Sequence, residues 1–231
     1  MSQFKQEPSA YLVKKPRYKD YYPIAFDLIN SYQFTSVLDV GCASGDFLEL
    51  IPYPNVKCIG VDVSEELIRF AKSRNTNKNV NYYCVNILNE HFEFKIDIQF
   101  VTIFGTAVTI DNLQLLIDKV MLLNPKLIML NDVVNVNGVD VICGYKKDLN
   151  DEFNFAYNIR SFSTWEKILK NYENYSIRFE PYKMDTNLKR LKDPIRNFHS
   201  NIDGEIVQRN GLDLILRPYN IYIMKTKNIK N

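Results

Sequence analysis

The feature that most constrains this chain is residues 36–51, where an apolar strand, a turn of small residues and a helix follow one another without a break. Residues 36–40 read SVLDV and have the short apolar pattern of a buried strand. The turn at 41–45 reads GCASG, and glycine is needed there where the backbone takes a positive φ or passes close to a ligand. Residues 45–51 then carry apolar side chains at helical spacing. This order predicts the first βα unit of a cofactor-binding α/β fold.

A second predicted strand, residues 57–61, is followed by Asp62, which lies 21 residues after Gly41. In βαβ folds of this kind, an acid at this place binds the ribose hydroxyls of the cofactor. A dinucleotide fingerprint would also require a glycine at position 46. The chain has Asp46 there, and its negative charge would lie where a pyrophosphate must bind at the helix N-terminus. The spacing therefore disfavours a dinucleotide.

Small residues fall instead at Gly41, Ala43 and Gly45. Together with Asp62, this pattern resembles motif I of the class I S-adenosylmethionine (SAM)-dependent methyltransferases, with Ala43 in place of the commoner middle glycine. The resemblance implies that the chain is a SAM-dependent methyltransferase with SAM as its cofactor. SAM carries no phosphate, so the turn need only let the backbone approach the amino-acid end of the cofactor.

Strand-like and helix-like segments alternate along the chain, which predicts an α/β fold with a mostly parallel sheet and helices on both faces. Helices are expected at 18–32, 45–51, from Ser64 onward, 111–123 and 164–171. Strands are expected at 36–40, 57–61, 80–85, 96–104, 126–130, 175–179 and 219–225. The resemblance implies the Rossmann-like class I methyltransferase fold, a seven-stranded, mostly parallel sheet with an antiparallel last strand.

Two segments fall outside the repeating units, 133–160 and 181–217. They follow the fifth and sixth strands, near the carboxyl edge where open α/β sheets bind ligands. We interpret them as a substrate cap on a single domain, residues 1–231, with residues 1–35 as an N-terminal helical lid. The alternative is that they are long surface loops, although loops of this length in a compact domain are usually functional or disordered.

The resemblance assigns SAM-binding roles to residues at the ends of four predicted strands. Asp39, near the end of the first strand, accepts hydrogen bonds from the SAM ammonium, and Asp62, after the second, accepts them from both ribose hydroxyls. Asn86 stands where related families place an acid against the adenine amino group, and Val63 and Ile87 are the apolar residues expected beside the adenine ring. An aromatic face suits the sulfonium cation. The residues are Asp39, Gly41, Ala43, Gly45, Asp62, Val63, Asn86, Ile87 and Phe104.

The acceptor is expected to be a small molecule. The chain has no Asp/Asn-Pro-Pro-Tyr motif after the fourth strand and no Pro-Cys nucleophile, which disfavours nucleic-acid base methylation. Residues 131–132, 140–145, 192–199 and 210–216 are similar to those of bacterial small-molecule methyltransferases found beside surface-polysaccharide (capsule) genes. This similarity implies an acceptor such as a sugar or a phosphorylated amino-alcohol.

Three residues are candidates for catalysis. His199 is the first candidate for a general base, against the alternative of a surface or supporting histidine. Asp132, expected at the carboxyl end of the fifth strand, is the second, against a turn-forming role. Arg196, with Arg190 and Lys192, is a candidate for binding a phosphate or carboxylate of the acceptor, although such residues are more often solvated.

Composition narrows the partners further. The formal net charge of +2 indicates no general attraction to nucleic acid or to membranes. The four cysteines lie far apart without metal-ligand spacing, so we expect reduced thiols and no metal site. The N-terminus has no apolar signal region, and no apolar run is long enough to span a membrane. These features favour a cytoplasmic protein with a small-molecule acceptor.

Two alternatives remain beside the methyltransferase interpretation. A nicotinamide-dependent oxidoreductase on a Rossmann-like sheet would use Asp62 in the same way but is disfavoured by Asp46. A SAM-binding subunit without transferase activity would keep the whole cofactor site and lack an acceptor.

Overall fold

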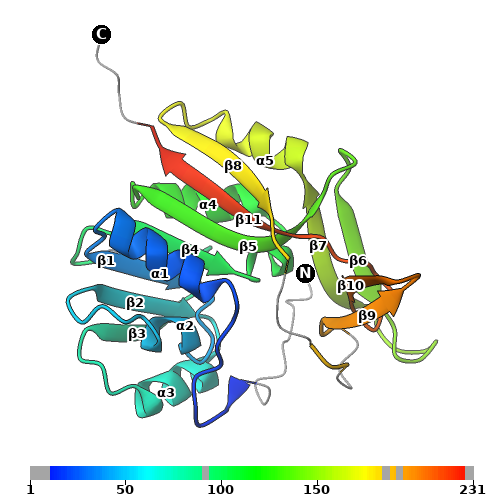
Figure 1. Cartoon of the computed structure of the whole chain (residues 1–231), viewed down its shortest axis with the longest axis horizontal. Coiled ribbons are helices and arrows are strands. Elements are labelled where there is room, and N and C mark those ends of the chain that lie inside the picture. The colour runs from blue at the N-terminus through cyan, green and yellow to red at the C-terminus, as the bar shows by residue number, and fades with distance from the viewer. Residues whose placement is uncertain (1–10, 90–93, 184–187, 191–194, 227–231) are drawn as a thin grey trace.

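A twisted β-sheet forms the centre of the computed structural model, which describes residues 11–89, 94–183, 188–190 and 195–226 (Figure 1). Its main strands lie in the order β3-β2-β1-β4-β5-β11-β8. The first five of these strands pair in parallel, and β11 is antiparallel to both of its neighbours. The bounds are β1 (Ser36–Val40), β2 (Lys57–Asp62), β3 (Val80–Cys84), β4 (Phe100–Phe104), β5 (Leu127–Asn135), β8 (Tyr175–Pro181) and β11 (Pro218–Lys225). The expected mostly parallel sheet with an antiparallel last strand is confirmed, but two further strands join it, so within the described residues the sheet has nine strands rather than the expected seven.

Helices cover both faces of this sheet, because alternate residues of each buried strand point to opposite sides. Val37 of β1 belongs to one apolar core, and Leu38 and Val40 belong to the other. The first core is covered by α1 (Tyr22–Ser31), α2 (Asp46–Glu49) and α3 (Glu65–Arg74). The second is covered by α4 (Leu113–Met121), α5 (Phe162–Leu169) and the 3-10 turn η2 (Ala107–Thr109). In Figure 1, α1 lies in front of the sheet and α4 behind it.

Local sequence signals account for most helix starts. Ser64 caps α3 by accepting a hydrogen bond from the N–H of Leu67, as the Ser-Glu-Glu sequence predicts. Asn112 and Ser161 cap α4 and α5 in the same way. None of the helices within the described ranges combines the length and the apolar character that a bilayer crossing requires.

The two largest differences from the expected strand boundaries are in β4 and β5. β4 begins at Phe100 rather than at 96, and Ser36 bonds instead to the backbone of Asp97 and Gln99 in the preceding segment. β5 continues past 130 to Asn135, because β11 pairs with it as far as Val133 and β7 pairs with its last two residues.

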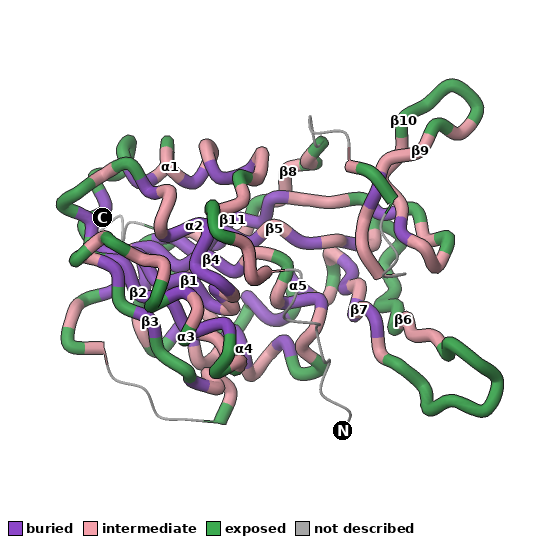
Figure 2. Tube along the Cα trace, turned by 90° about the horizontal axis from the view of Figure 1, so that it is seen from below, coloured by how far each residue is buried: buried purple, intermediate pink, exposed green. Residues whose placement is uncertain are grey.

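The segments 133–160 and 181–217 contain two antiparallel hairpins rather than loops. The first joins β6 (Val141–Tyr145) to β7 (Asn154–Ser161), and the second joins β9 (Phe198–Ile202) to β10 (Glu205–Arg209). Both project beyond the same end of the main sheet (Figure 1), and their tips are largely exposed (Figure 2). The expectation of seven strands missed these hairpins, because each has only one side that is partly buried. Their role as a substrate cap stays a prediction.

Close packing of α2 against the sheet depends on Gly60 in the middle of β2. A Cβ at this position would lie 2.7 Å from Cδ1 of Tyr82 and 2.8 Å from Sγ of Cys42. We therefore expect Gly60→Val to lower the free energy of unfolding by about 1–3 kcal/mol through overpacking. The measurement is urea unfolding followed by circular dichroism.

Lys57→Val provides the matched control, because Lys57 is an exposed residue of the same strand and its replacement should change stability by less than about 0.5 kcal/mol. Equal stability of the two variants would show that α2 is not packed against Gly60 as described.

Candidate functional site

In the turn between β1 and α2, every second residue has a positive φ, in the left-handed region of backbone conformation. Gly41 has φ 75°, Ala43 has φ 48° and Gly45 has φ 77°. A Cβ at Gly41 would overlap the side chain of Thr106, and one at Gly45 would overlap the ring of Tyr82. Glycine is therefore required at both ends of the turn, as the sequence predicts. The positive φ of Ala43 is energetically unfavourable for a residue that has a side chain. Such a conformation persists only where the surrounding structure fixes it.

Asp62, at the end of β2, is one of the residues that fix this turn. Its Oδ2 accepts a hydrogen bond from the N–H of Ala43 at 2.9 Å, and its Oδ1 accepts one from the N–H of Ser64 at 2.9 Å. Burial raises the pKa of this carboxyl, against the lowering effect of these backbone donors. Each carboxylate oxygen can accept a further hydrogen bond, so Asp62 can hold the turn and still bind two ribose hydroxyls.

Asp46, the first residue of α2, anchors the turn from the other side. The carboxylate is 4% exposed and lies 2.9 Å from Nε of Arg17 and 2.7 Å from Nη2 of Arg74. Ser44 also donates a hydrogen bond to it. Arg74 further donates to the carbonyl oxygens of Ser44 and Val13. These contacts join the turn, the end of α3 and the N-terminal segment 11–21.

Asp39 lies at the base of the same region, where β1 approaches its end. It is buried, and Thr102 of β4 donates a hydrogen bond to its Oδ1 at 2.7 Å. Burial raises the pKa of Asp39 to about 7, and the Thr102 bond and the charge of Lys19 oppose this rise. Because Asp39 pairs with Thr102 in the parallel register, both side chains point to the face of the sheet that α1 covers.

Aromatic rings gather at the carboxyl end of β4, around Phe104. Its centroid lies 4.8 Å from that of Tyr21, 5.1 Å from that of Phe47 and 6.0 Å from that of Tyr22. Tyr182 packs edge-on against Tyr21 at 5.9 Å. The faces of such rings attract cations, which is what the sequence expected of Phe104. Tyr21 and Tyr22 contact Phe104 and Tyr182 contacts Tyr21, and no local sequence pattern reveals these contacts.

The residues expected beside the adenine ring follow β2 and β3, which are neighbours in the sheet. Val63 is 67% exposed, and Asn86 and Ile87 are half-buried. Asn86 uses its Oδ1 to accept a hydrogen bond from the N–H of Leu88. The structure thus places these three side chains at one carboxyl edge, next to Asp62.

Asp132 is not at the end of a strand, since β5 continues to Asn135. The sequence-based position was wrong for this reason. However, the parallel pairing of β4 with β5 ends at Phe104 and Asn131, so Asp132 lies one residue beyond the carboxyl edge of the parallel sheet. It is 7% exposed, and burial raises its pKa to about 8, against the effects of the Val133 N–H and the charge of Arg160.

His199 and Arg196 lie in and next to the β9–β10 hairpin. The Nδ1 of His199 accepts a hydrogen bond from the N–H of Leu188 at 3.0 Å, which leaves the proton of the neutral ring on Nε2. In that tautomer the ring has no lone pair available to act as a base. Arg196 donates to the Tyr11 hydroxyl at 3.1 Å. Arg190 lies over the ring of Phe198, and Lys192 is outside the described residues.

Arg160 is a residue near the site that the sequence analysis missed. It is 9% exposed and donates to the carbonyl oxygens of Ile110 and Asp111, in the connection from β4 to α4. Asn158, two residues earlier, donates to the same two residues. The alternation of Asn158 and Arg160 along a predicted strand could have indicated a buried polar face, had β7 been recognised.

A shallow cavity of about 460 Å³ lies elsewhere, beside the outer strand β3. Its lining includes Lys57, the first residue of β2, and exposed lysines at 78 and 95. Because Lys57 and Asp62 are at opposite ends of β2, this cavity is separate from the region around the 41–45 turn.

Comparison with known proteins agrees with this geometry. A family model described as a methyltransferase domain matches residues 33–177, more than half of the chain. No curated protein sequence is a match for this chain.

Several solved structures have the same fold. The YcgJ protein from Bacillus subtilis aligns with a TM-score of 0.61 and 15% identity, over 90% of this chain and 98% of that one. A putative S-adenosylmethionine-dependent methyltransferase from Listeria monocytogenes aligns with a TM-score of 0.58 and 14% identity, over 88% and 100%. Magnesium protoporphyrin IX methyltransferase from Synechocystis PCC 6803, solved with bound SAM, aligns with a TM-score of 0.54 and 10% identity, over 89% of this chain and 78% of that one. At these identities the likeness concerns the fold alone.

The raised pKa of Asp132 predicts how stability depends on pH. In the unfolded chain this carboxyl ionises near its ordinary pKa of 3.8, whereas the folded protein retains the proton up to about pH 8. The folded state therefore binds more protons between these values, and the free energy of unfolding should fall as pH rises from about 4 to 8. Asp39 contributes in the same direction.

We expect Asp132→Asn to show a smaller decrease over this range, measured by urea unfolding at each pH. Glu173→Gln, at an exposed acid, should behave as the wild type. An unchanged slope in Asp132→Asn would mean that this carboxyl is ionised in the folded protein.

Proposed function

The chain belongs to the methyltransferase-domain family, and on this premise we propose that it transfers the methyl group of SAM to an oxygen or nitrogen atom of a small polar metabolite. When bound, SAM supplies a methyl group made electrophilic by the positively charged sulfur that carries it. The observation that carries the proposal is the 41–45 turn, with its three positive φ values and its two carboxylate anchors.

The side chains around this turn fit SAM better than a dinucleotide. The buried carboxylate of Asp46 occupies the start of α2 and is already paired with two guanidinium groups. A pyrophosphate there would be repelled by that carboxylate and would compete with it for the arginines. Asp62 offers acceptors for ribose hydroxyls, and Asp39 offers one for an ammonium group. Family membership and this charge arrangement both favour a SAM-dependent methyltransferase over the oxidoreductase alternative.

The chain's own residues would act mainly by positioning. Asp62 holds the ribose, and the rings of Tyr21 and Phe104 border the place where a sulfonium is attracted by aromatic faces. Tyr21 is 5% exposed, so this wall also excludes water. Aligning a nucleophile with the bond to be broken supplies a large part of the rate enhancement in such displacements.

The acceptor would bind between this wall and the two hairpins. The hairpins extend from the end of the sheet at which β1 and β2 finish (Figure 1). Polar side chains on the β9–β10 side, among them Arg196 and His199, suit an acceptor with hydroxyl, phosphate or carboxylate groups. With the resemblance of segments 140–145 and 192–199, this supports a sugar or phosphorylated amino-alcohol precursor of a bacterial surface glycan, used in the cytoplasm.

Asp132 is the better candidate for general base. Its pKa of about 8 is close to the pH at which a base works best, and it lies one residue beyond the last pair of β4 and β5. His199 instead uses its accepting nitrogen to hold the backbone of Leu188. We assign His199 a positioning role in the hairpin.

Ligand binding tests the cofactor directly. We expect S-adenosylhomocysteine (SAH) to raise the melting temperature of the wild type and NADH to leave it unchanged. Asp62→Asn should weaken SAH binding by about 10- to 100-fold, because hydrogen bonds to a charged group contribute about 1.5–3 kcal/mol. Isothermal titration calorimetry gives the dissociation constants.

Glu173→Gln serves as the control that keeps wild-type affinity. Stabilisation by NADH and none by SAH would contradict the proposed function.

Release of SAH from SAM tests the acceptor and the base. We expect turnover with members of a panel of sugars, nucleotide-sugars and amino-alcohol phosphates, and none with transfer RNA or duplex DNA. With the active acceptor, Asp132→Asn should lower kcat by about 10²- to 10⁴-fold with little change in the KM for SAM. His199→Ala should retain more activity than Asp132→Asn, and the reverse order would restore His199 as the base.

A further inference from the structure

Lys19 is a half-buried lysine on the N-terminal segment that crosses the carboxyl edge of the sheet. Its Nζ lies 5.5 Å from the centroid of the Tyr21 ring, and the hydroxyl of Tyr21 is close enough to raise the pKa of Lys19. The hydroxyls of Tyr11 and Tyr22 are also close enough to raise the pKa of Lys19. The lysine therefore has three phenol groups as neighbours, and no carboxylate of the described residues is in direct contact with it.

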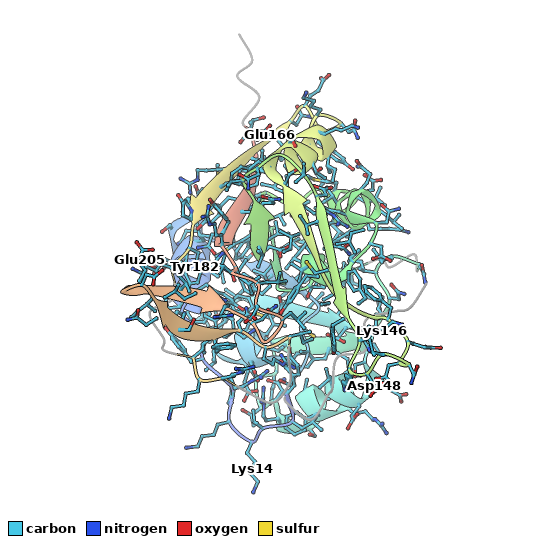
Figure 3. All side chains as sticks on the ribbon, turned by 90° about the vertical axis from the view of Figure 1, so that its right-hand side faces the viewer. Lys14, Lys146, Asp148, Glu166, Tyr182 and Glu205 are labelled. Carbon is cyan, nitrogen blue, oxygen red and sulfur yellow. The ribbon has the colours of Figure 1, made fainter. Side chains whose placement is uncertain are left out.

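The segment that carries Lys19 is held on both sides. Before it, Arg17 pairs with Asp46, and the carbonyl oxygen of Val13 accepts a hydrogen bond from Arg74. After it, the N–H of Tyr22 donates to the carbonyl oxygen of Lys19 as α1 begins. Lys14, on the same segment, projects away from the protein (Figure 3). Lys19 is therefore positioned by the fold, unlike a solvated surface lysine.

Lys19 differs from the other cations near the turn in its charge partners. Arg17 and Arg74 are already paired with Asp46, and Arg74 is also paired with Glu49. Among the described residues, Lys19 takes part in no ion pair within 4.0 Å. Its charge nonetheless acts on Asp39, whose pKa it lowers against the effect of burial. Lys19 is also placed near the carboxyl ends of the strands by geometry, since its Nζ lies over the Tyr21 ring and that ring packs on Phe104 of β4.

A cation that forms no ion pair with the described residues and a buried carboxyl in the same region are the two groups that the head group of an amino acid requires. Such a group carries an ammonium and a carboxylate on one carbon atom, so its binding site needs an acceptor of negative charge and a donor of positive charge side by side. The sequence analysis provided only the first, Asp39. Hydrogen bonds between an ammonium and a carboxylate are charge-assisted and are therefore among the stronger hydrogen bonds in proteins.

We propose that Lys19 binds the α-carboxylate of the methionine part of SAM, opposite Asp39. The inference rests on the proposed function, since it presupposes that SAM occupies the region around the 41–45 turn. Tyr21 then has two contacts, because its hydroxyl orients the Lys19 ammonium while its ring packs on Phe104. The N-terminal segment supplies part of the cofactor site rather than only covering it.

Calorimetric titration of Lys19→Met with two ligands tests this assignment. SAH carries the amino-acid head, whereas 5′-methylthioadenosine has the same adenosine and sulfur without it. We expect Lys19→Met to weaken SAH binding by about 10- to 100-fold, the range for a hydrogen bond to a charged group. Its affinity for 5′-methylthioadenosine should stay within about twofold of wild type, which also shows that the variant is folded.

Lys14→Met is the matched control, because it removes a lysine from the same segment at an exposed position. It should bind both ligands as the wild type does. Lys19→Arg keeps the charge and should bind SAH more tightly than Lys19→Met. Decarboxylated SAM, which keeps the ammonium and lacks the carboxylate, should bind wild type and Lys19→Met equally.

The outcomes separate this inference from the proposed function. If wild type binds SAH and Lys19→Met binds it equally well, the Lys19 assignment is wrong and the cofactor is not in question. If Lys19→Met weakens both ligands alike, Lys19 supports the fold of the site and does not bind the carboxylate. If the wild type binds neither SAM nor SAH, both the inference and the proposed function fail.

Discussion

The arrangement of the site depends on the buried carboxylate of Asp46. Removing a carboxylate from water costs several kcal/mol unless it is paired and hydrogen-bonded, and here Arg17 and Arg74 both contact it. The two arginines come from the N-terminal segment and from the end of α3, so the ion pairs fix three separate parts of the chain around one turn. Loss of either partner would leave a buried charge only partly compensated. The left-handed conformation of Ala43 is stable because this group and Asp62 hold the turn from opposite sides.

Charged groups of both signs lie around the 41–45 turn. Asp62 ends β2, and Asp39 is the last residue but one of the neighbouring strand β1. The N-terminal segment adds a lysine and a set of aromatic rings. A cationic sulfur and a zwitterionic head group both suit such a surface. In the proposed function, the two hairpins at the same end of the sheet contact the acceptor.

The sequence predicts the parts of this structure that local patterns determine. The glycines of the 41–45 turn, the acid after β2 and the order of buried strands each follow from short-range rules, and all are found. The hairpins β6–β7 and β9–β10 were missed because β6 and β10 have no buried residue, and because β7, β9 and β10 mix polar with apolar residues. The extension of β5 was missed because it depends on pairing with β11 and β7. Lys19, Tyr21 and Arg160 reach the site through tertiary contacts, and no spacing in the sequence marks them.

A crystal structure with SAH tests the central claim most directly, namely that the turn between β1 and α2 holds the amino-acid end of the cofactor. The account predicts density for the homocysteine part beside residues 41–45, with its ammonium toward Asp39 and its ribose hydroxyls on Asp62. Density for the ligand beside β3, or a 41–45 turn closed by protein side chains in a crystal grown with saturating SAH, would contradict it.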